Sequence, residues 1–373
     1  MDIIIDYVIP FLVILTILVF VHELGHYWVA RRNNVRVEVF SIGFGPEMFG
    51  FNDSHGTRWK FSAIPLGGYV KMFGEGDTIE EEEKEEERPL TPEEIAVSFH
   101  HKRLGQRSAI VAAGPIANFL FAIIVLAGLY GVAGVPAPLA GVGTVQPDSA
   151  AAAADMRPGD RIVEISGQPV KWFKDMRAIV MDSPAMVLTL QIIRDDAEIS
   201  IKVTPTAKTV GGDGGTSREI GILGVTPHAD MIEYESVSPF RALVLGAERT
   251  YGLTMMIMGN IGEILGGTRS SDELGGIIKI ADFSGQMLAR GWADAFFFLA
   301  MLSINLGLIN FFPIPMLDGG HLVFYAAEAV LGRPIGARVQ EYSFRFGLIL
   351  ILILMVYVNW NDVVSYRILE FNN

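Results

Sequence analysis

The stretch VFVHELGHYWVARR, Val19 to Arg32, places two histidines and a glutamate directly after a run that is apolar from Tyr7 to Val21. A charged or strongly polar side chain near the middle of a bilayer costs about 3 kcal/mol or more, so such residues usually face the protein interior and take part in function. The stretch therefore predicts a polar site inside a membrane span.

The composition also indicates a membrane protein. Half of the 373 residues are apolar and 19% are charged, which is less charge than in a typical soluble protein. Segments that approach the roughly 20 residues needed to cross a bilayer predict a polytopic α-helical membrane protein with four transmembrane helices, at residues 1–30, 108–135, 293–320 and 346–361. The first should remain in the protein, because it has neither the basic start nor the small-residue cleavage site of a signal peptide.

Basic residues beside the spans predict the orientation. They form three groups on one side of the spans: Arg31, Arg32 and Arg36; Lys102, Arg103 and Arg107; Arg333, Arg338 and Arg345. Because such residues are retained in the cytoplasm, we expect a cytoplasmic loop over residues 321–345. Both termini and the long segment between the second and third spans should then be extracytoplasmic.

Two further segments connect the spans. Much of the net charge of −13 lies in the run EGDTIEEEEKEEERPLTPEEI, Glu75 to Ile95, which lacks the apolar content to fold alone. We expect residues 76–107 to be an acidic cytoplasmic linker, with a docking or regulatory role as the alternative. Residues 229–292 carry an amphipathic helical stripe and should lie on the membrane surface or against the spans.

Residues 139–228 change to short β-branched runs separated by Gly, Pro and Asp. GVGTVQ, DRIVEISG, MVLTLQIIR and EISIKVTP predict strands, AAAAADM and WFKDMRAIVM predict short helices, and Asp195-Asp196 predicts a turn. This order, with RPGDRI from Arg157 to Ile162, resembles a bacterial PDZ domain, although Asp155-Met156 replaces a usual glycine. The resemblance implies an inserted extracytoplasmic α+β domain that binds peptide C-termini. A β-rich spacer without a ligand is the alternative.

The polar stretch in the first span fits the pattern H-E-x-x-H, from His22 to His26. Side chains four residues apart share a helix face, so both histidines can bind one metal ion while Glu23 lies beside it. Two imidazoles and one carboxylate are a usual ligand set of catalytic zinc, with the fourth position left for water. A base beside that water is what metal-assisted hydrolysis requires. The chain has no cysteine, which excludes thiolate ligands and disulfides.

The third ligand must come from elsewhere, and the segment NFFPIPMLDGGH, Asn310 to His321, offers candidates in Asp318 and His321. Pro313 and Pro315 remove helix hydrogen bonds, so the backbone here should be kinked or unwound. Irregular backbone at membrane depth is tolerated only against protein or a water-filled cavity. The segment is therefore a place where a peptide could be held beside a metal ion.

HELGH in the first span and N-x-x-P-x-P-x-L-D-G-G in the third together resemble the site-2 protease family of intramembrane zinc metalloproteases, in particular the bacterial RseP type with a PDZ insertion. The resemblance implies that His22, His26 and Asp318 bind zinc, in preference to a site that uses His321, and that Glu23 activates water. It also implies a location in the bacterial inner (cytoplasmic) membrane.

The same resemblance extends to the substrate and to other segments. It implies that Asn310 holds the substrate backbone; Asn305 is a weaker candidate that could equally pack between helices. Residues 31–75, with GFGPEMFGF and TRWKFSAIPLGGYVKMFGE, resemble the family's membrane-associated β-loop, whose exposed edge could pair with an unwound substrate. AAGPIANF, Ala112 to Phe119, resembles the span-two motif of the family. We assign it and Asn118 to helix packing.

We therefore expect a zinc-dependent intramembrane endopeptidase that cleaves transmembrane segments of pre-trimmed single-span membrane proteins. The resemblance implies regulated intramembrane proteolysis, with anti-sigma factors or signal-peptide remnants as substrates. The expected partners are these transmembrane substrates, peptide C-termini at the PDZ domain and the lipid bilayer, and no nucleic acid.

Two other functions are compatible with parts of the sequence. A non-catalytic membrane adaptor could use the PDZ domain and a structural metal site, although such a site takes four protein ligands and needs no spare base. A transporter could use the proline-broken span, but it predicts repeat symmetry between the two halves of the chain, and the sequence shows none.

Overall fold

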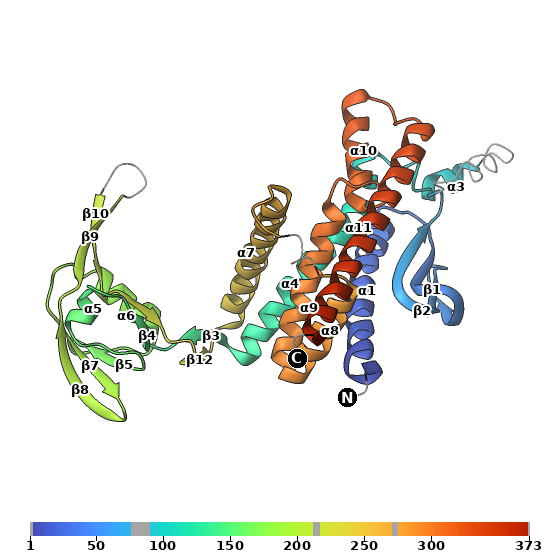
Figure 1. Cartoon of the computed structure of the whole chain (residues 1–373). Coiled ribbons are helices and arrows are strands. Elements are labelled where there is room, and N and C mark those ends of the chain that lie inside the picture. The colour runs from blue at the N-terminus through green and yellow to red at the C-terminus, as the bar shows by residue number, and fades with distance from the viewer. Residues whose placement is uncertain (1–2, 76–89, 212–216, 271–274, 372–373) are drawn as a thin grey trace. The chain divides into compact units, whose positions relative to one another are not determined.

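The computed structural model describes residues 3–75, 90–211, 217–270 and 275–371 (Figure 1). Residues 76–89 of the expected acidic linker lie outside this range. The chain divides into two compact units, one formed by Met1–Leu129 with Pro239–Asn373 and the other by Tyr130–Ser238. The first unit contains the long apolar helices, and the second is rich in strands.

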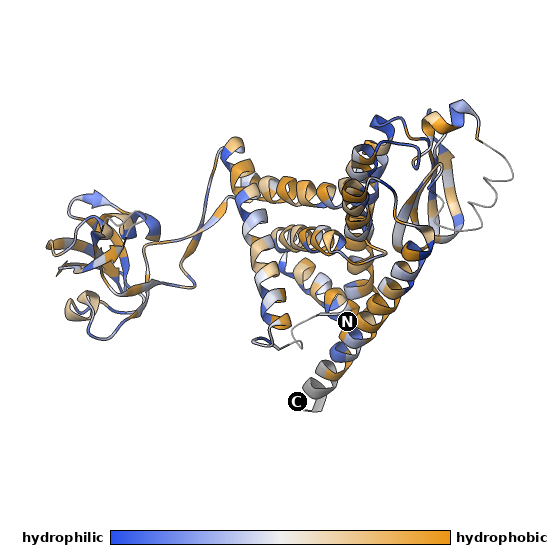
Figure 2. Cartoon of the chain, turned by 90° about the horizontal axis from the view of Figure 1, so that it is seen from above, coloured by the Kyte–Doolittle hydropathy of each residue, from blue (hydrophilic) through white to orange (hydrophobic). Residues whose placement is uncertain are grey.

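Four helices of the first unit are long and apolar enough to cross a membrane, and apolar residues cover much of their length (Figure 2). They are α1 (Ile9–Arg32), which continues the short π-helix η1 (Ile4–Val8), α4 (Leu104–Ala133), α9 (Trp292–Phe311) and α11 (Ala337–Phe371). Pro10 is the second residue of α1, which directly follows the π-helical turn. The chain leaves α1 through Asn34, which has a positive φ of 57°. Four spans are the number that the sequence predicts.

The third expected span does not continue as one helix through residues 293–320. α9 ends at Phe311, and the next helix, α10 (Asp318–Leu331), begins after a break. Met316 in the break has a φ of 86°, a left-handed conformation that non-glycine residues rarely adopt. The two prolines that remove N–H donors explain why the helix stops here. The irregular backbone predicted from these prolines is confirmed.

The expected loop over residues 321–345 is largely helical, which corrects its predicted structure. α10 occupies its first part, and α11 begins at Ala337, nine residues before the expected start of the fourth span at residue 346. Aromatic packing explains the extra helix, because the rings of His321 and Phe324 on α10 both lie against Phe344 on α11, with centroids 5.2 and 5.7 Å away.

The region expected to be amphipathic forms two helices that belong to the first unit, α7 (Pro239–Leu265) and α8 (Ile277–Arg290). α8 packs against α1 and α9. Its N-terminus is capped from α11, since the backbone N–H groups of Gly276 and Lys279 donate to the two carboxylate oxygens of Asp362 at 3.0 Å each. α7, which carries the expected amphipathic stripe, packs against α9, so of the two expected placements it follows the one against the spans.

Between α1 and the short helix α3 (Pro92–Val97), the strands β1 (Val37–Asn52) and β2 (Arg58–Met72) pair antiparallel and both bend. The pairing makes four short runs that lie side by side in the order 47–52, 58–62, 37–42 and 68–72. Among the described residues, the first and last runs are the edges of this sheet. Large apolar side chains are exposed on the loop: Phe44, Met48, Phe49, Phe51, Phe61, Ile64 and Leu66.

The second unit is built around a four-stranded sheet in the order β6-β5-β7-β8. Its elements are β3 (Val135–Pro138), β4 (Val142–Val145), α5 (Ala150–Ala153), β5 (Arg161–Ile165), β6 (Gln168–Pro169), α6 (Phe173–Met181), β7 (Leu188–Arg194), β8 (Ala197–Val203), β9 (Thr206–Gly211), β10 (Ser217–Ile222), β11 (Val225–Pro227) and β12 (Ile232–Glu235). Alternate apolar residues of the central strands form the core, with Ile162, Ile165, Leu190 and Ile192 buried.

The strands and short helices predicted for this unit all occur. The local backbone also accommodates Asp155-Met156, which stands where a glycine is usual. Asp155 follows α5 with a φ of 52°, so an aspartate adopts the left-handed conformation in which glycine usually ends a helix. Asp195 and Asp196 have φ values of 50° and 63° and form the predicted turn between β7 and β8. The β9–β10 hairpin and the β3–β12 pair were not expected from the sequence.

Asp53 links the turn between β1 and β2 to α1 through hydrogen bonds. Its carboxylate accepts hydrogen bonds from the Tyr27 hydroxyl at 2.7 Å, the Trp59 indole at 3.1 Å and the backbone N–H of Thr57 at 2.9 Å. Partial burial acts to raise the pKa of this carboxyl, but these bonds lower it, and the net pKa lies below the ordinary value. The charged form is thus favoured in the folded loop.

We expect Asp53→Asn to weaken hydrogen-exchange protection of the loop amides at neutral pH, whereas Glu198→Gln, at an exposed strand position, leaves them unchanged. Because the folded-state pKa is depressed, this stabilisation is present above the unfolded pKa of about 4 and is lost as the pH falls below it. The wild-type loop should therefore lose the same protection on acidification, after correction for intrinsic exchange. Equal protection in Asp53→Asn and wild type at neutral pH would contradict this role.

Candidate metal centre

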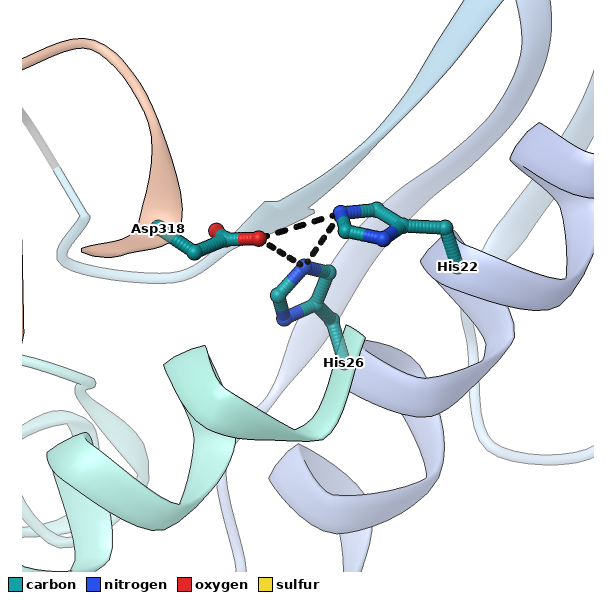
Figure 3. Close-up of side chains that lie close together, drawn as sticks. All are labelled: His22, His26 and Asp318. Carbon is teal, nitrogen blue, oxygen red and sulfur yellow. Dashed lines mark hydrogen bonds and ion pairs between the residues drawn. The ribbon is translucent and has the colours of Figure 1, made fainter. Parts of the chain in front are cut away.

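Three side chains from two distant parts of the sequence converge in the first unit: His22, His26 and Asp318 (Figure 3). The two histidine Nε2 atoms lie 3.2 Å apart. Asp318 Oδ2 lies 3.1 Å from Nε2 of His22 and 3.6 Å from Nε2 of His26. Both histidines are buried, and Asp318 is partly buried.

The helices explain why these side chains meet. His22 and His26 lie one turn apart on the same face of α1, as the spacing predicts. Asp318 is the first residue of α10, directly after the break that follows α9. Gly319 lets α10 start there, because a Cβ at this position would lie 2.2 Å from the carbonyl oxygen of Phe312. The break and the glycine together bring Asp318 up to α1.

The remaining ring nitrogens of the two histidines also have partners. Nδ1 of His26 lies 2.9 Å from the carbonyl oxygen of Ile110 on α4. A carbonyl only accepts, so this nitrogen carries the proton, and Nε2 of the neutral ring has a free lone pair. Nδ1 of His22 lies 3.2 Å from the side-chain amide of Asn118, also on α4.

The donor set fits a zinc ion. Ligand atoms about 2.0–2.1 Å from a tetrahedral zinc lie about 3.3 Å from one another, and the three observed separations, 3.1, 3.2 and 3.6 Å, surround that value. Oδ2 of Asp318 is buried without a hydrogen-bond partner among the described residues. Two imidazole nitrogens and a carboxylate oxygen that converge in a buried site are stabilised by a shared cation.

Glu23 lies next to His22 on α1, and its carboxylate accepts a hydrogen bond from the backbone of Val70 on β2. It lines a cavity of about 1320 Å³ together with the three converging side chains. The run 68–72 contributes Tyr69, Val70 and Met72 to the wall of this cavity. An edge of the β-loop therefore borders the space in front of the metal-binding atoms.

The other predicted residues differ in whether they line this cavity. Asn310 lies near the end of α9 and lines the cavity, whereas Asn305, one and a half turns earlier, is not among the lining residues. His321 also lines the cavity, but its ring packs on Phe344 and is not part of the converging group.

Asn118 is the residue whose place at this site the sequence did not predict. It was assigned to helix packing, and it is fully buried between helices, but its amide contacts His22. No signal in the sequence of α4 indicates this contact, because tertiary packing sets the register of two helices.

Comparisons with known proteins agree with this geometry. The sequence profile of peptidase family M50 matches residues 10–354. Proteins named as zinc metalloproteases from Agrobacterium fabrum and Rhizobium meliloti are each 42% identical over 361 residues, which cover 96% of this chain and 96% of the relative. A regulator of sigma-E protease from Salmonella typhimurium is 32% identical over 451 residues, with 94% of this chain and 97% of that protein covered.

One solved structure also aligns with part of the chain. It is the PDZ domain of an SdrC-like protein from Listeria monocytogenes, which covers 23% of this chain and 84% of that one, at 22% identity and a TM-score of 0.18.

We expect Asp318→Ala to lower the affinity for zinc by more than about 100-fold, since loss of an outer-shell partner alone costs about 10–100-fold. His321→Ala is the matched control, because it removes a nearby imidazole that lies outside the converging group. Zinc affinity is measured in detergent by competition with a chelator. Zinc lost in His321→Ala and retained in Asp318→Ala would reverse the assignment of the third ligand.

Proposed function

This chain belongs to peptidase family M50 and is a zinc-dependent membrane protease of the site-2 type, and we propose that it cleaves peptide bonds within transmembrane segments of other proteins. The observation that carries the proposal is the convergence of Asp318 with His22 and His26 beside Glu23. The two histidines and Glu23 lie on a helix long and apolar enough to span a membrane. The arginines that follow this helix favour a site toward the cytoplasmic face.

In the proposed reaction, His22, His26 and Asp318 hold the zinc ion. When bound, zinc polarises the scissile carbonyl and makes water more acidic. The Glu23 carboxylate takes the proton from the attacking water and passes it to the leaving amine nitrogen. Its hydrogen bond to the backbone of Val70 keeps the carboxylate turned toward the cavity.

A helical substrate must open before it can be cut, because a helix uses its backbone N–H and C=O groups internally. We propose that the run 68–72 pairs with the opened segment as an added strand. The same edge lines the cavity and contacts Glu23, which supports this position. Asn310 is proposed to hydrogen-bond the substrate backbone from the other wall, and Asn305 takes no part.

The exposed apolar side chains of the β-loop support its contact with the lipid bilayer. A soluble protein rarely exposes so many large apolar residues on one small sheet. We propose that residues 31–75 are membrane-associated and that their aromatic residues lie at the depth of the lipid headgroups.

The proposed substrates are single-span membrane proteins already shortened by another protease, such as anti-sigma factors or signal-peptide remnants. The name of the Salmonella relative, regulator of sigma-E protease, supports a role in such regulated proteolysis. We propose that the second unit is a PDZ domain that binds new peptide C-termini. The membrane is the bacterial inner membrane, with the PDZ domain and both termini extracytoplasmic and the basic residues inside.

Glu23→Gln should retain zinc and lose cleavage by about 10²–10⁴-fold or more, because the amide fills the same space but cannot take a proton. The assay is cleavage of a tagged, truncated single-span substrate by the purified protein in detergent, with bound zinc quantified in both forms. Wild-type protein that binds zinc but cuts none of several truncated substrates would favour the non-catalytic adaptor.

Asn310→Ala should raise the substrate KM by about fivefold to tenfold, as expected for one lost hydrogen bond of about 1 kcal/mol, without a change in bound zinc. Asn305→Ala is the matched control on the same helix and should leave KM unchanged. If the two variants behave alike, Asn310 does not hold the substrate.

A further inference from the structure

The face of α4 that lies against the two histidines presents three residues at four-residue intervals: Ile110, Gly114 and Asn118. Each contacts a ring of the pair on α1. The carbonyl of Ile110 and the ring of His26 form a hydrogen bond, and the Asn118 amide lies on His22. The two helices thus meet with their turns in register at the metal-binding atoms.

Gly114 lets the helices approach this closely. A Cβ at Gly114 would lie 2.2 Å from Nε2 of His26 and 2.6 Å from its Cε1, so no larger residue fits beside the ring in this position. This turn therefore has space for the imidazole beside the carbonyl of Ile110.

The Asn118 amide can contact His22 in two orientations with nearly the same shape. As placed, Nδ2 points to Nδ1 of His22, and the buried Oδ1 has no hydrogen-bond partner among the described residues. With Nδ2 as the donor, the proton of a neutral His22 must be on Nε2. That proton would point among the other metal-binding atoms, 3.2 Å from Nε2 of His26 and 3.1 Å from Oδ2 of Asp318.

We propose that Asn118 is a positioning residue of the zinc site, with its amide turned so that Oδ1 accepts a hydrogen bond from Nδ1–H of His22. The Ile110 carbonyl does the same for His26. Both rings are then held as the tautomer whose Nε2 lone pair faces the metal position, which is how outer-shell partners usually orient histidine ligands. The proposal rests on the ligand set assigned above.

Asn118 is itself held from a third helix. The hydroxyl of Ser303 on α9 donates to the backbone carbonyl of Asn118 at 2.8 Å, and both residues are fully buried. This bond positions the α4 backbone without touching the amide. Ser303 therefore offers a control that disturbs the same helix contact and leaves the hydrogen bond to His22 in place.

The test measures zinc affinity of the full-length protein in detergent by chelator competition, with thermal stability recorded for each variant. Asn118→Ala removes the acceptor and should lower zinc affinity by about 10–100-fold. Asn118→Asp keeps an oxygen acceptor but cannot donate, and it should bind zinc within about threefold of wild type or more tightly. Ser303→Ala should keep its zinc affinity whatever its thermal stability.

A second measurement reads the tautomer directly. In zinc-free protein with ¹⁵N-labelled histidine, the His22 ring should be in the Nδ1–H form in wild type and Asn118→Asp, and in a mixture of tautomers in Asn118→Ala. Weak zinc binding by a folded Asn118→Asp, or wild-type affinity in Asn118→Ala, overturns the proposal. If Asn118→Ala does not fold, the zinc affinity of Asn118→Asp and the His22 tautomer of the wild-type protein still test the proposal.

These outcomes are separate from those of the proposed function. Protein that shows the expected zinc affinities and tautomers but cuts no substrate would leave the Asn118 proposal standing and remove the protease mechanism. If the wild-type protein cuts substrate and Asn118→Ala keeps wild-type zinc affinity, the protease mechanism stands and the Asn118 proposal is wrong.

Discussion

The site depends on one electrostatic constraint, that two imidazole nitrogens and a carboxylate oxygen converge in a buried space. Nε2 of His22, Nε2 of His26 and Oδ2 of Asp318 lie 3.1 to 3.6 Å apart, and a cation between them would offset the cost of burying these polar atoms together. The helices must therefore be packed firmly enough to hold these atoms together. The close approach of α4 at Gly114 and the short break before Asp318 both serve this purpose.

The same constraint explains the order in which the elements surround the metal position. α1 carries two of the proposed ligands and the adjacent glutamate, α10 carries the proposed third ligand, and α4 contacts the outer nitrogens of the rings. The cavity opens on the remaining side, which the 68–72 run borders. An edge strand thus lies next to the site that is proposed to cut a peptide held along it.

Much of the membrane unit could be predicted because lipid imposes strong rules. The number of spans, the shared helix face of His22 and His26, and the irregular backbone at Pro313 and Pro315 follow from hydrophobic length, helix geometry and missing N–H donors. The helical structure of residues 321–345 did not follow, since it depends on ring packing against Phe344. The contact of Asn118 with His22 was also missed, because the register of two helices is a tertiary property that one helix does not encode.

The cap on α8 has a consequence for how the membrane unit is made. The first N–H groups of this helix bond to Asp362, 86 residues further along the chain from Gly276. Those donors have no such acceptor until α11 has been synthesised and inserted, and an uncapped helix end is costly where water is scarce. The N-terminal cap of α8 can therefore form only after almost the whole chain has been synthesised.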